Sequence, residues 1–454
     1  MERPARPDPR PNPLARRIFR KGRRLNREKR FYEAIAAFEA AVALEPRYAD
    51  AHNGLGVAHH GVGRVEAAVA AYRRALKIDP AHAKAHNNLG TAHMGRNEVG
   101  LAMAAYHRAL GLNRFIPKFR VNLAFAQLLR GDFPAGFRNY ESRWAAGEPW
   151  SGRSPGKAWR GERPLKGRSI LLHSEQGFGD MIQFVRFVPR VVDLGARVHL
   201  EAKPQLRRLF QASFPQIEAI HVSGEPLPRC DEYCPVPSLP RALGVELSTI
   251  PSQVPYLRAP ERCRGARISL APGTPRIGIA WSGSLEHDDD RNRSIPFEHF
   301  REILRGSTSR FVSLQKDVRA RDRAALAATP AVANFMDRIG DFADTAALIE
   351  KLDLVVCVDT SIAHLAGALG KPVWLLLPFA PDWRWMLDRS DSPWYPLTRL
   401  FRQPRAGDWD SVFTEVRAEL RARYPSRRAD GGRARPRPFS KPTPGPLPYS
   451  AAMA

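Results

Sequence analysis

Polar side chains that could contact a ligand lie in three short turns, each of which follows an apolar run. One turn contains Asp359, Thr360 and Ser361 directly after a continuous aliphatic segment. Backbone N–H groups at the start of the helix that these residues begin would suit a phosphate or a diphosphate. A second turn contains Arg293, and a guanidinium binds phosphate oxygens through two hydrogen bonds. The pattern indicates a phosphate-binding edge, although an ordinary strand and helix capped by Asp359 would show the same residues.

The remaining turn contains Gly177 and Gly179, followed by Asp180. The two glycines permit a ligand to approach the backbone closely. The third glycine of a dinucleotide fingerprint is absent, as is the lysine of a phosphate-binding loop, so a nicotinamide enzyme is a weak alternative. On these residues alone, Asp180 is best explained as the cap of the helix that follows it.

Each turn must be held by a strand on one side and a helix on the other. The apolar runs at 169–173, 276–280 and 354–358 predict buried strands, and helical spacing of apolar residues follows at 181–192 and 362–369. Runs that are apolar on both faces are typical of parallel sheets. The second half of the chain is therefore predicted to be α/β, with its ligands at the carboxyl ends of the strands.

The first third of the chain repeats with a period of 34 residues. Small residues recur in one column and aromatic residues in another, which in three of the units are Gly22 with Phe38, Gly56 with Tyr72, and Gly90 with Tyr106. Small residues let two helices approach closely, and the aromatic ring fills the gap that remains. This pattern resembles the tetratricopeptide repeat in four units, and it predicts an α solenoid.

Side-chain amides lie near the inner face of the first helices of the repeats, where they could pair with the backbone of an extended peptide. These residues are Asn53, Asn87, Asn88 and Asn122. The alternative is an exposed helix face with no ligand. His52 and His86 occupy one repeat column, which indicates duplicated packing positions more strongly than a metal pair at His82 and His86.

Length and composition limit the class of protein. The chain has 454 residues, which is too long for one core, and its hydrophobic content of 43% is that of a globular protein. No apolar run approaches the roughly 20 residues of a membrane span, and the N-terminus has no apolar signal segment. Four cysteines fit a reducing compartment, so we expect a cytoplasmic protein. The spacing of Cys230 and Cys234 does not match a zinc motif, and no metal is expected.

The formal net charge of +25 is concentrated at the two ends of the chain. Residues 1–30 carry 12 Lys and Arg against 3 Asp and Glu, and residues 421–454 carry 8 against 1. Both ends are rich in proline and arginine, and this composition predicts disordered tails. The charge therefore does not predict a specific nucleic-acid partner.

Taken together, the three turns resemble those of the heptosyltransferase-type GT-B glycosyltransferases. The matching motifs are G-x-G-D at 177–180, R-S-I-P at 293–296 and D-T-S-x-x-H-L-A-x-A-L-G-x-P at 359–372. With the repeats in front, the chain resembles bacterial repeat proteins fused to such a module. The resemblance implies an α solenoid followed by two Rossmann-like domains in the GT-B arrangement.

The resulting domain map has six parts. They are a disordered basic tail at 1–14, the repeat solenoid at 15–148, a linker at 149–167, an acceptor-side Rossmann-like domain at 168–265, a nucleotide-sugar-binding Rossmann-like domain at 270–424, and a disordered Pro/Arg-rich tail at 425–454.

Carried over to this sequence, the resemblance implies that Asp180 is the catalytic base. It also implies donor contacts from Gly177, Gly179, Arg293, Asp359, Thr360, Ser361 and His364. Arg293 stands where the family has a phosphate-binding lysine, and arginine keeps the positive charge. The implied reaction is a metal-independent, inverting transfer of a sugar from a nucleotide sugar to an acceptor hydroxyl, with the nucleotide sugar as co-substrate and no cofactor.

The partners implied are a nucleotide-sugar donor, a protein or glycan acceptor, and a protein bound by the repeats. A second class of function stays open, because the same residues would occur in a binding scaffold whose sugar-nucleotide module has lost its catalytic activity. The aromatic loop from Phe379 to Trp385, followed by Trp394 and Tyr395, allows two interpretations. Its rings could stack on a nucleotide, or they could wedge two domains together.

Overall fold

The structure, a computed structural model, describes residues 12–146, 156–270, 272–287, 289–305 and 307–425. Most of the two expected tails, the start of the expected linker, and Asp288 lie outside these residues. The described residues divide into two compact units, of which the first contains those up to 130 and from 138 to 146, and the second those from 131 to 137 and from 156 onward.

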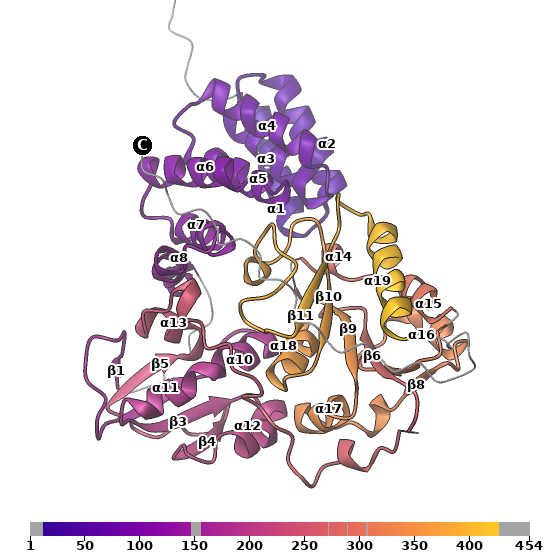
Figure 1. Ribbon diagram of the computed structural model, residues 1–454. Helices are drawn as coiled ribbons and strands as arrows, with labels where there is room; N and C mark the ends of the chain where they lie inside the picture. The colour runs from indigo at the N-terminus through magenta and orange to yellow at the C-terminus, as the bar shows by residue number, and fades with distance from the viewer. Residues whose placement is uncertain (1–11, 147–155, 271, 288, 306, 426–454) are drawn as a thin grey trace, which may run out of the picture. The chain divides into compact units, whose positions relative to one another are not determined.

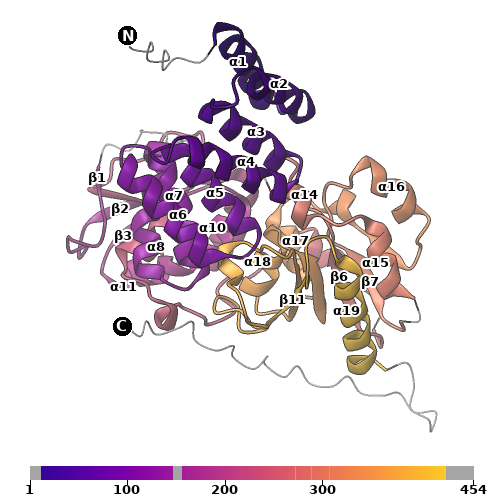
Figure 2. The ribbon, with the colours of Figure 1, turned by 90° about the horizontal axis from the view of Figure 1, so that it is seen from above.

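The first unit is a helical tetratricopeptide solenoid that contains successive helix pairs (Figures 1 and 2). Its helices are α1 (Pro13–Arg27), α2 (Phe31–Leu44), α3 (Ala49–Gly61), α4 (Val65–Ile78), α5 (Ala83–Gly95), α6 (Val99–Leu112), α7 (Pro117–Leu129) and α9 (Arg143–Ala146), while α8 (Phe133–Tyr140) crosses the boundary of the unit.

In three of the helix pairs, a glycine in the first helix makes room for the aromatic ring of the second. A Cβ atom on Gly56 would lie 2.5 Å from the ring of Tyr72, and one on Gly90 would lie 2.7 Å from the ring of Tyr106. Side chains do not tolerate such distances, so the two helices pack this closely only because the column is glycine. The physical reason for the repeat pattern is therefore confirmed.

The repeated histidines also have the packing role that the sequence favoured. The ring Nε2 of His52 lies 3.0 Å from the carbonyl oxygen of Pro46, and the ring Nε2 of His86 lies 3.0 Å from that of Pro80. The same contact in two units ties the start of a helix to the turn before it. Nδ1 of His82 accepts the backbone N–H of Ala85 at 3.1 Å, and its Nε2 lies 3.1 Å from Oδ1 of Asp50.

The second unit contains two α/β lobes, and each lobe has a sheet of parallel strands. The sheet of the first lobe has the order β1-β5-β2-β3-β4, and its strands are β1 (Lys157–Ala158), β2 (Ser169–His173), β3 (Arg197–Ala202), β4 (Ala219–Val222) and β5 (Glu232–Pro235). Its helices are α10 (Phe178–Phe184), α11 (Val188–Asp193), α12 (Arg207–Ser213) and α13 (Leu239–Ala242).

The sheet of the second lobe has the order β11-β10-β9-β6-β7-β8. Its strands are β6 (Arg276–Ala280), β7 (Arg310–Ser313), β8 (Val332–Asn334), β9 (Leu354–Val358), β10 (Val373–Leu377) and β11 (Thr398–Arg402). Its helices are α14 (Asp290–Arg293), α15 (Phe297–Leu304), α16 (Ala320–Ala327), α17 (Phe342–Ile349), α18 (Ser361–Ala368) and α19 (Trp409–Arg423). Short 3₁₀ helices are η1 (Val185–Phe187), η2 (Pro204–Leu206), η3 (Val236–Ser238), η4 (Leu247–Thr249), η5 (Gly265–Arg267), η6 (Met336–Arg338) and η7 (Trp383–Trp385).

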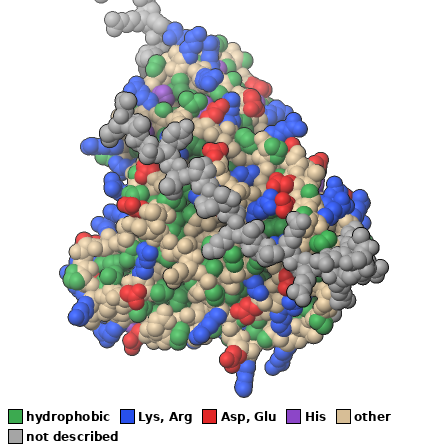
Figure 3. Space-filling model, viewed as in Figure 1, with side chains coloured by type: hydrophobic (Ala, Val, Ile, Leu, Met, Phe, Trp, Pro, Cys, Tyr) green, Lys and Arg blue, Asp and Glu red, His purple; other side chains and the backbone are tan. Residues whose placement is uncertain are grey.

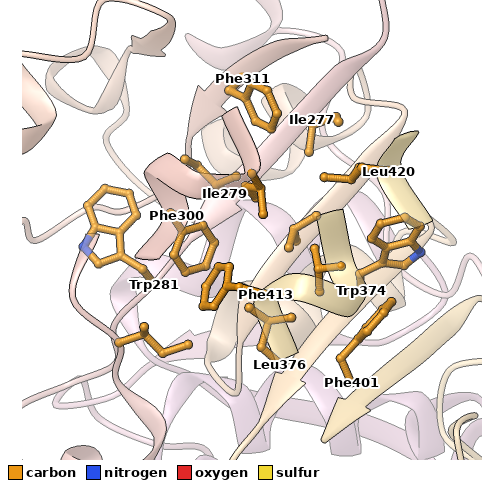
Figure 4. Close-up of a cluster of buried hydrophobic side chains, with 14 of the residues drawn as sticks. Ile277, Ile279, Trp281, Phe300, Phe311, Trp374, Leu376, Phe401, Phe413 and Leu420 are labelled. Atoms are coloured by element: carbon orange, nitrogen blue, oxygen red, sulfur yellow. The ribbon is translucent and has the colours of Figure 1, made fainter. Parts of the chain in front are cut away.

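A large hydrophobic core lies under α15 and α19 in the second lobe (Figure 4). Ile277 and Ile279 of β6 and Leu376 of β10 meet Phe300 of α15 and Phe413 of α19 in this cluster, and all of them are buried. Because this face is filled by packed side chains, the strand positions are fixed, and the turns at the carboxyl ends of β6 and β9 are fixed with them.

Three local predictions differ from the structure. Lys157 and Ala158 form strand β1, although they fall in the range expected to be a linker. The single helix expected at 181–192 begins at Phe178 and is interrupted by η1, because Pro189 has no N–H with which to continue an α-helix. The turn expected to contain Arg293 includes the short helix α14.

Charged side chains are mixed rather than gathered on the face of the molecule drawn in Figure 3, where Asp and Glu lie among Lys and Arg. Within the described ranges, none of the helices combines the length and the apolar character that a membrane crossing requires.

Candidate functional site

The carboxyl ends of β6 and β9 bring two of the predicted turns together. These strands pair in parallel, with Ala280 opposite Cys357, so the residues that follow them meet at one edge of the sheet. Nη1 of Arg293 donates a hydrogen bond of 3.0 Å to the backbone carbonyl of Asp359. The structure therefore places the predicted guanidinium on the predicted phosphate turn.

Helix α18 begins at this turn. The side chain of Thr360 accepts the backbone N–H of Ile362 at 3.3 Å, and Ser361 is the first helical residue. All three are partly exposed, so the start of the helix is accessible at the edge of the sheet. The N–H groups there and the positive end of the helix dipole favour an anion.

The carboxyl group of Asp359 is in an unusual environment. Burial raises its pKa to about 7, and the neighbouring carboxylate of Asp382 adds to the rise, whereas Arg293 and Arg384 oppose it. Nε2 of His364 lies 3.9 Å from Oδ1 of Asp359. A carboxyl group with a pKa raised toward neutral pH beside two guanidinium groups is typical of a functional site.

His364 is packed tightly on the inner side of this turn. Its Nδ1 lies 2.8 Å from the hydroxyl of Tyr395, and its ring stacks on Trp385 with the centroids 5.4 Å apart. Burial lowers the pKa of His364 well below its usual value, and nearby guanidinium groups lower it further. The imidazole is therefore neutral, and His364 would contact a donor as a neutral hydrogen-bonding group.

The glycine turn of the first lobe lies against the start of α18. Helices α10 and α18 are side by side in Figures 1 and 2 and pack on one another. A Cβ atom on Gly179 would lie 2.8 Å from Cδ2 of His364, so the imidazole occupies the open side of this glycine. Gly177 caps α10 in an extended conformation. The role of both glycines as donor contacts stays a prediction.

Asp180 has the capping contact that the sequence favoured, and it has a second contact that the sequence did not suggest. Its Oδ2 accepts the backbone N–H of Gly177 at 3.0 Å. Its Oδ1 accepts a short hydrogen bond from Nη2 of Arg384, which lies in η7 of the other lobe. Asp180 is therefore a cap and also one end of an ion pair between the lobes.

Some of the buried polar atoms without hydrogen-bond partners lie at the carboxyl ends of strands in the two lobes. Among the described residues, Oγ of Ser282 and Nε of Arg293 have no hydrogen-bond partner, and neither does Oγ of Ser174 in the first lobe. Ser174 follows β2 and Ser282 follows β6, so both stand at carboxyl ends of strands. Buried donors are normally satisfied, and such atoms suit an oxygen-rich ligand.

The aromatic loop packs the lobes together. Trp383, Trp385, Trp394 and Tyr395 are at most 4% exposed. Arg186 of the first lobe lies over the rings of Trp394 and Tyr395, and its Nη1 donates to the carbonyl oxygen of Trp394 at 2.6 Å. Of the two interpretations that the sequence allowed, wedging of the domains is therefore the one that the contacts support.

Asp290, the first residue of α14, is buried and forms an ion pair. Both carboxylate oxygens of Asp290 lie 2.7 Å from Nη2 of Arg319, and the side chain is buried. Burial raises the pKa of Asp289, and Asn292 and Arg293 oppose the rise. In the part of the chain that is described, no group of three or more His, Cys, Asp or Glu side chains could hold a metal ion.

The four predicted peptide-contacting residues form one hydrogen-bonded row in the solenoid. Nδ2 of Asn88 donates to Oδ1 of Asn53 at 2.9 Å, and Nδ2 of Asn122 donates to Oδ1 of Asn87 at 2.9 Å. Nδ2 of Asn87 reaches Oδ1 of Asn88 at 3.3 Å. The row crosses three repeats, and its amides are oriented before any partner binds.

Two family models match parts of the chain. A model described as tetratricopeptide repeat matches residues 19–83 and 60–118. A model described as glycosyltransferase family 9 (heptosyltransferase) matches residues 298–376. The second match includes the turn from Asp359 to His364 but stops short of Arg293 and Asp180, so it supports the second lobe alone.

Individual proteins are similar to the chain over different parts of it. Protein FlbA from Caulobacter vibrioides is 28% identical over 323 residues, which are 65% of this chain and 53% of that protein. The chain thus spans about half the length of this curated relative. Among solved structures, MamA is 19% identical over 29% of this chain and 77% of its own, with a TM-score of 0.27. The tetratricopeptide domain of Sgt2 from Aspergillus fumigatus is 20% identical over 31% of this chain and 88% of its own length, with a TM-score of 0.25.

Proposed function

We propose that this chain, in which tetratricopeptide repeats precede a region of the glycosyltransferase family 9 type, transfers a sugar from a nucleotide sugar to an acceptor hydroxyl. The observation that carries the proposal is the convergence of three features at one edge of the second lobe. These features are the start of α18, the guanidinium of Arg293 on the carbonyl of Asp359, and the unpaired donors of Ser282 and Arg293.

In the proposed reaction, Asp180 takes the proton of the acceptor hydroxyl as the oxygen attacks the anomeric carbon of the donor. The bond between that carbon and the diphosphate oxygen breaks, and its electron pair leaves with the nucleoside diphosphate. Arg293 and the N–H groups at the start of α18 would stabilise the negative charge that develops on the leaving group. Because these groups can balance the charge, we propose that the transfer needs no metal ion.

The first experiment measures binding and not turnover. We expect the full chain to be stabilised against thermal unfolding by at least one of ADP, GDP, UDP and CDP, because a ligand that binds only the folded state raises its stability. Arg293→Gln removes a charged hydrogen-bond donor worth about 1.5–3 kcal/mol, so affinity should fall roughly tenfold or more. No stabilisation by any of the four nucleotides would count against a donor site here.

The second experiment tests the base. Asp180→Asn keeps the shape of the side chain but cannot take up a proton, so transfer should fall by about 10² to 10⁴. Asp193→Asn is the matched control, since Asp193 is exposed at the end of α11 in the same lobe. Full activity of Asp180→Asn would assign the base to another residue.

A scaffold with a degenerate sugar-nucleotide module is the alternative function. It is favoured by the ion pair that engages Asp180 and by the aromatic side chains that fill the contact between the lobes. This alternative predicts that wild-type protein binds a partner but neither transfers nor hydrolyses any nucleotide sugar tried.

We also propose that the repeats recruit the acceptor or another protein. The row from Asn53 to Asn122 supports this role, because each side-chain amide has more donors and acceptors than the row uses. The four cysteines are free and buried, which supports a reducing compartment such as the cytoplasm.

A further inference from the structure

We infer that Arg384 is a positioning residue that fixes the carboxylate of Asp180 and links it to the donor turn of the other lobe. The inference rests on the proposed function, and it concerns a side chain that none of the family motifs contains. Arg384 lies in η7, and three of its nitrogen atoms have separate partners: Asp180, Asp382 and Gln183.

Two of these contacts fix side chains on one face of α10. Nε of Arg384 donates to Oε1 of Gln183 at 2.6 Å, while Nη2 donates to Oδ1 of Asp180. Asp180 and Gln183 are three residues apart on one helix, so their side chains lie on the same face. A planar guanidinium can satisfy both at once, whereas an ammonium group has no rigid fork with which to do so.

Burial makes the arrangement rigid. Arg384 is 8% exposed, and its guanidinium lies 4.5 Å from the ring centroid of Trp383 and 5.7 Å from that of Phe184. A buried charge must keep its partners, because an unpaired one is strongly unfavourable. The guanidinium therefore favours a position in which it keeps both of its carboxylate partners, Asp180 and Asp382.

The carboxylate of Asp180 can nevertheless accept a further hydrogen bond from an acceptor hydroxyl. Gly177 uses one lone pair of Oδ2 and Arg384 uses one of Oδ1, so each oxygen retains a site for a further hydrogen bond. The contacts with Gly177 and Arg384 orient the carboxylate in the first turn of α10, a helix that packs on α18. Arg384 acts here through Asp180 and not on the reacting atoms.

The third contact of Arg384, with Asp382, connects Asp180 to the turn that is proposed to bind the donor. Nη1 of Arg384 donates to Oδ1 of Asp382 at 2.9 Å, and Asp382 is the carboxylate that faces Asp359. Asp359 is also faced by Arg293, Arg384 and His364. A diphosphate bound at this turn would add negative charge within the same network, so donor binding and the placement of Asp180 become coupled through one guanidinium.

The experiment compares Arg384→Gln and Arg384→Lys with the control Arg389→Gln in the full chain. Arg389 lies in the same loop and is similarly buried, but its guanidinium pairs with Asp391, both contacts being 2.7 Å. We expect Arg384→Gln to lower kcat by at least tenfold and to change the donor KM by a smaller factor. Arg384→Lys should recover only part of the loss, and Arg389→Gln should leave kcat unchanged.

A second readout does not depend on turnover. Hydrogen exchange of the backbone amides of α10 should be faster in Arg384→Gln than in wild type or Arg389→Gln. In addition, Asp180→Asn with Arg384→Gln should lower Tm by less than the sum of the two single changes, because the double variant leaves no unpaired charge at this contact. If wild type is inactive with every nucleotide sugar, the proposed function fails while these two measurements still decide the positioning role. Additive Tm losses together with unchanged exchange of α10 would overturn the inference.

Discussion

At the scale of single residues, charge at the candidate site is balanced within a few side chains. Asp359 and Asp382 place two carboxyl groups beside the guanidinium groups of Arg293 and Arg384. Asp359 is only 13% exposed, so it loses much of its hydration. Burial raises the pKa of Asp359 toward neutral pH, so a small change in local charge can alter its protonation state there.

The raised pKa of Asp359 predicts how stability depends on pH. Its pKa is about 7 in the folded chain against a usual 3.8, so between these values the folded state holds a proton that the unfolded state has released. This contribution to stability is complete below about pH 4 and is lost as the pH rises through 7. Asp359→Asn should therefore stabilise the protein at pH 8, by up to roughly 4 kcal/mol, and have little effect at pH 4.

Thermal unfolding at the two pH values checks this expectation. Asp410→Asn is the control, because the side chain of Asp410 is 92% exposed and its replacement should change little at either pH. An equal effect of Asp359→Asn at both pH values would show that the carboxyl group titrates normally.

At the scale of secondary structure elements, strands and turns were predictable, and the contacts between lobes were not. The predicted strands at 169–173, 276–280 and 354–358 agree with β2, β6 and β9, because buried parallel strands have continuous apolar runs. The positions of the turns could be predicted as well, because each turn begins where a predicted strand ends. Arg384 could not be assigned in this way, since it meets Asp180 across 204 residues of sequence and only the packing of two lobes joins them.

Gly179 shows what the contact between α10 and α18 requires. Gly179→Ala would place a Cβ atom 2.8 Å from His364, whose ring is held by Trp385 and Tyr395. The imidazole has little freedom to move, so we expect a loss of about 1–3 kcal/mol in stability.

Chemical denaturation measures the loss, and Gly111→Ala is the matched control. Gly111 lies in α6, and a Cβ atom added to it would have nothing within 4 Å, so alanine there should be neutral or stabilising by up to about 1 kcal/mol. If the two substitutions behave alike, His364 is mobile and the packing of α10 on α18 is looser than the distances indicate.

At the scale of the whole molecule, the boundary between the two units falls inside α8. Residues 131–137 belong with the α/β lobes, although α8 itself continues to Tyr140. Phe133 stacks on Trp394 with the centroids 5.6 Å apart, and Phe137 meets Trp383 edge to face at 5.8 Å. A sequence boundary at residue 148 would therefore separate the lobes from part of their own aromatic core.

This boundary predicts that a substitution near residue 133 destabilises the α/β unit. Phe133 is fully buried, so Phe133→Ala should remove roughly 3–5 kcal/mol from its stability. Phe115→Ala is the control, because Phe115 is 80% exposed and its loss should cost little. Tryptophan fluorescence is a suitable probe, since seven of the nine tryptophans lie at residue 159 or beyond. An unchanged fluorescence transition in Phe133→Ala would assign the ring to the repeats and move the boundary back toward residue 148.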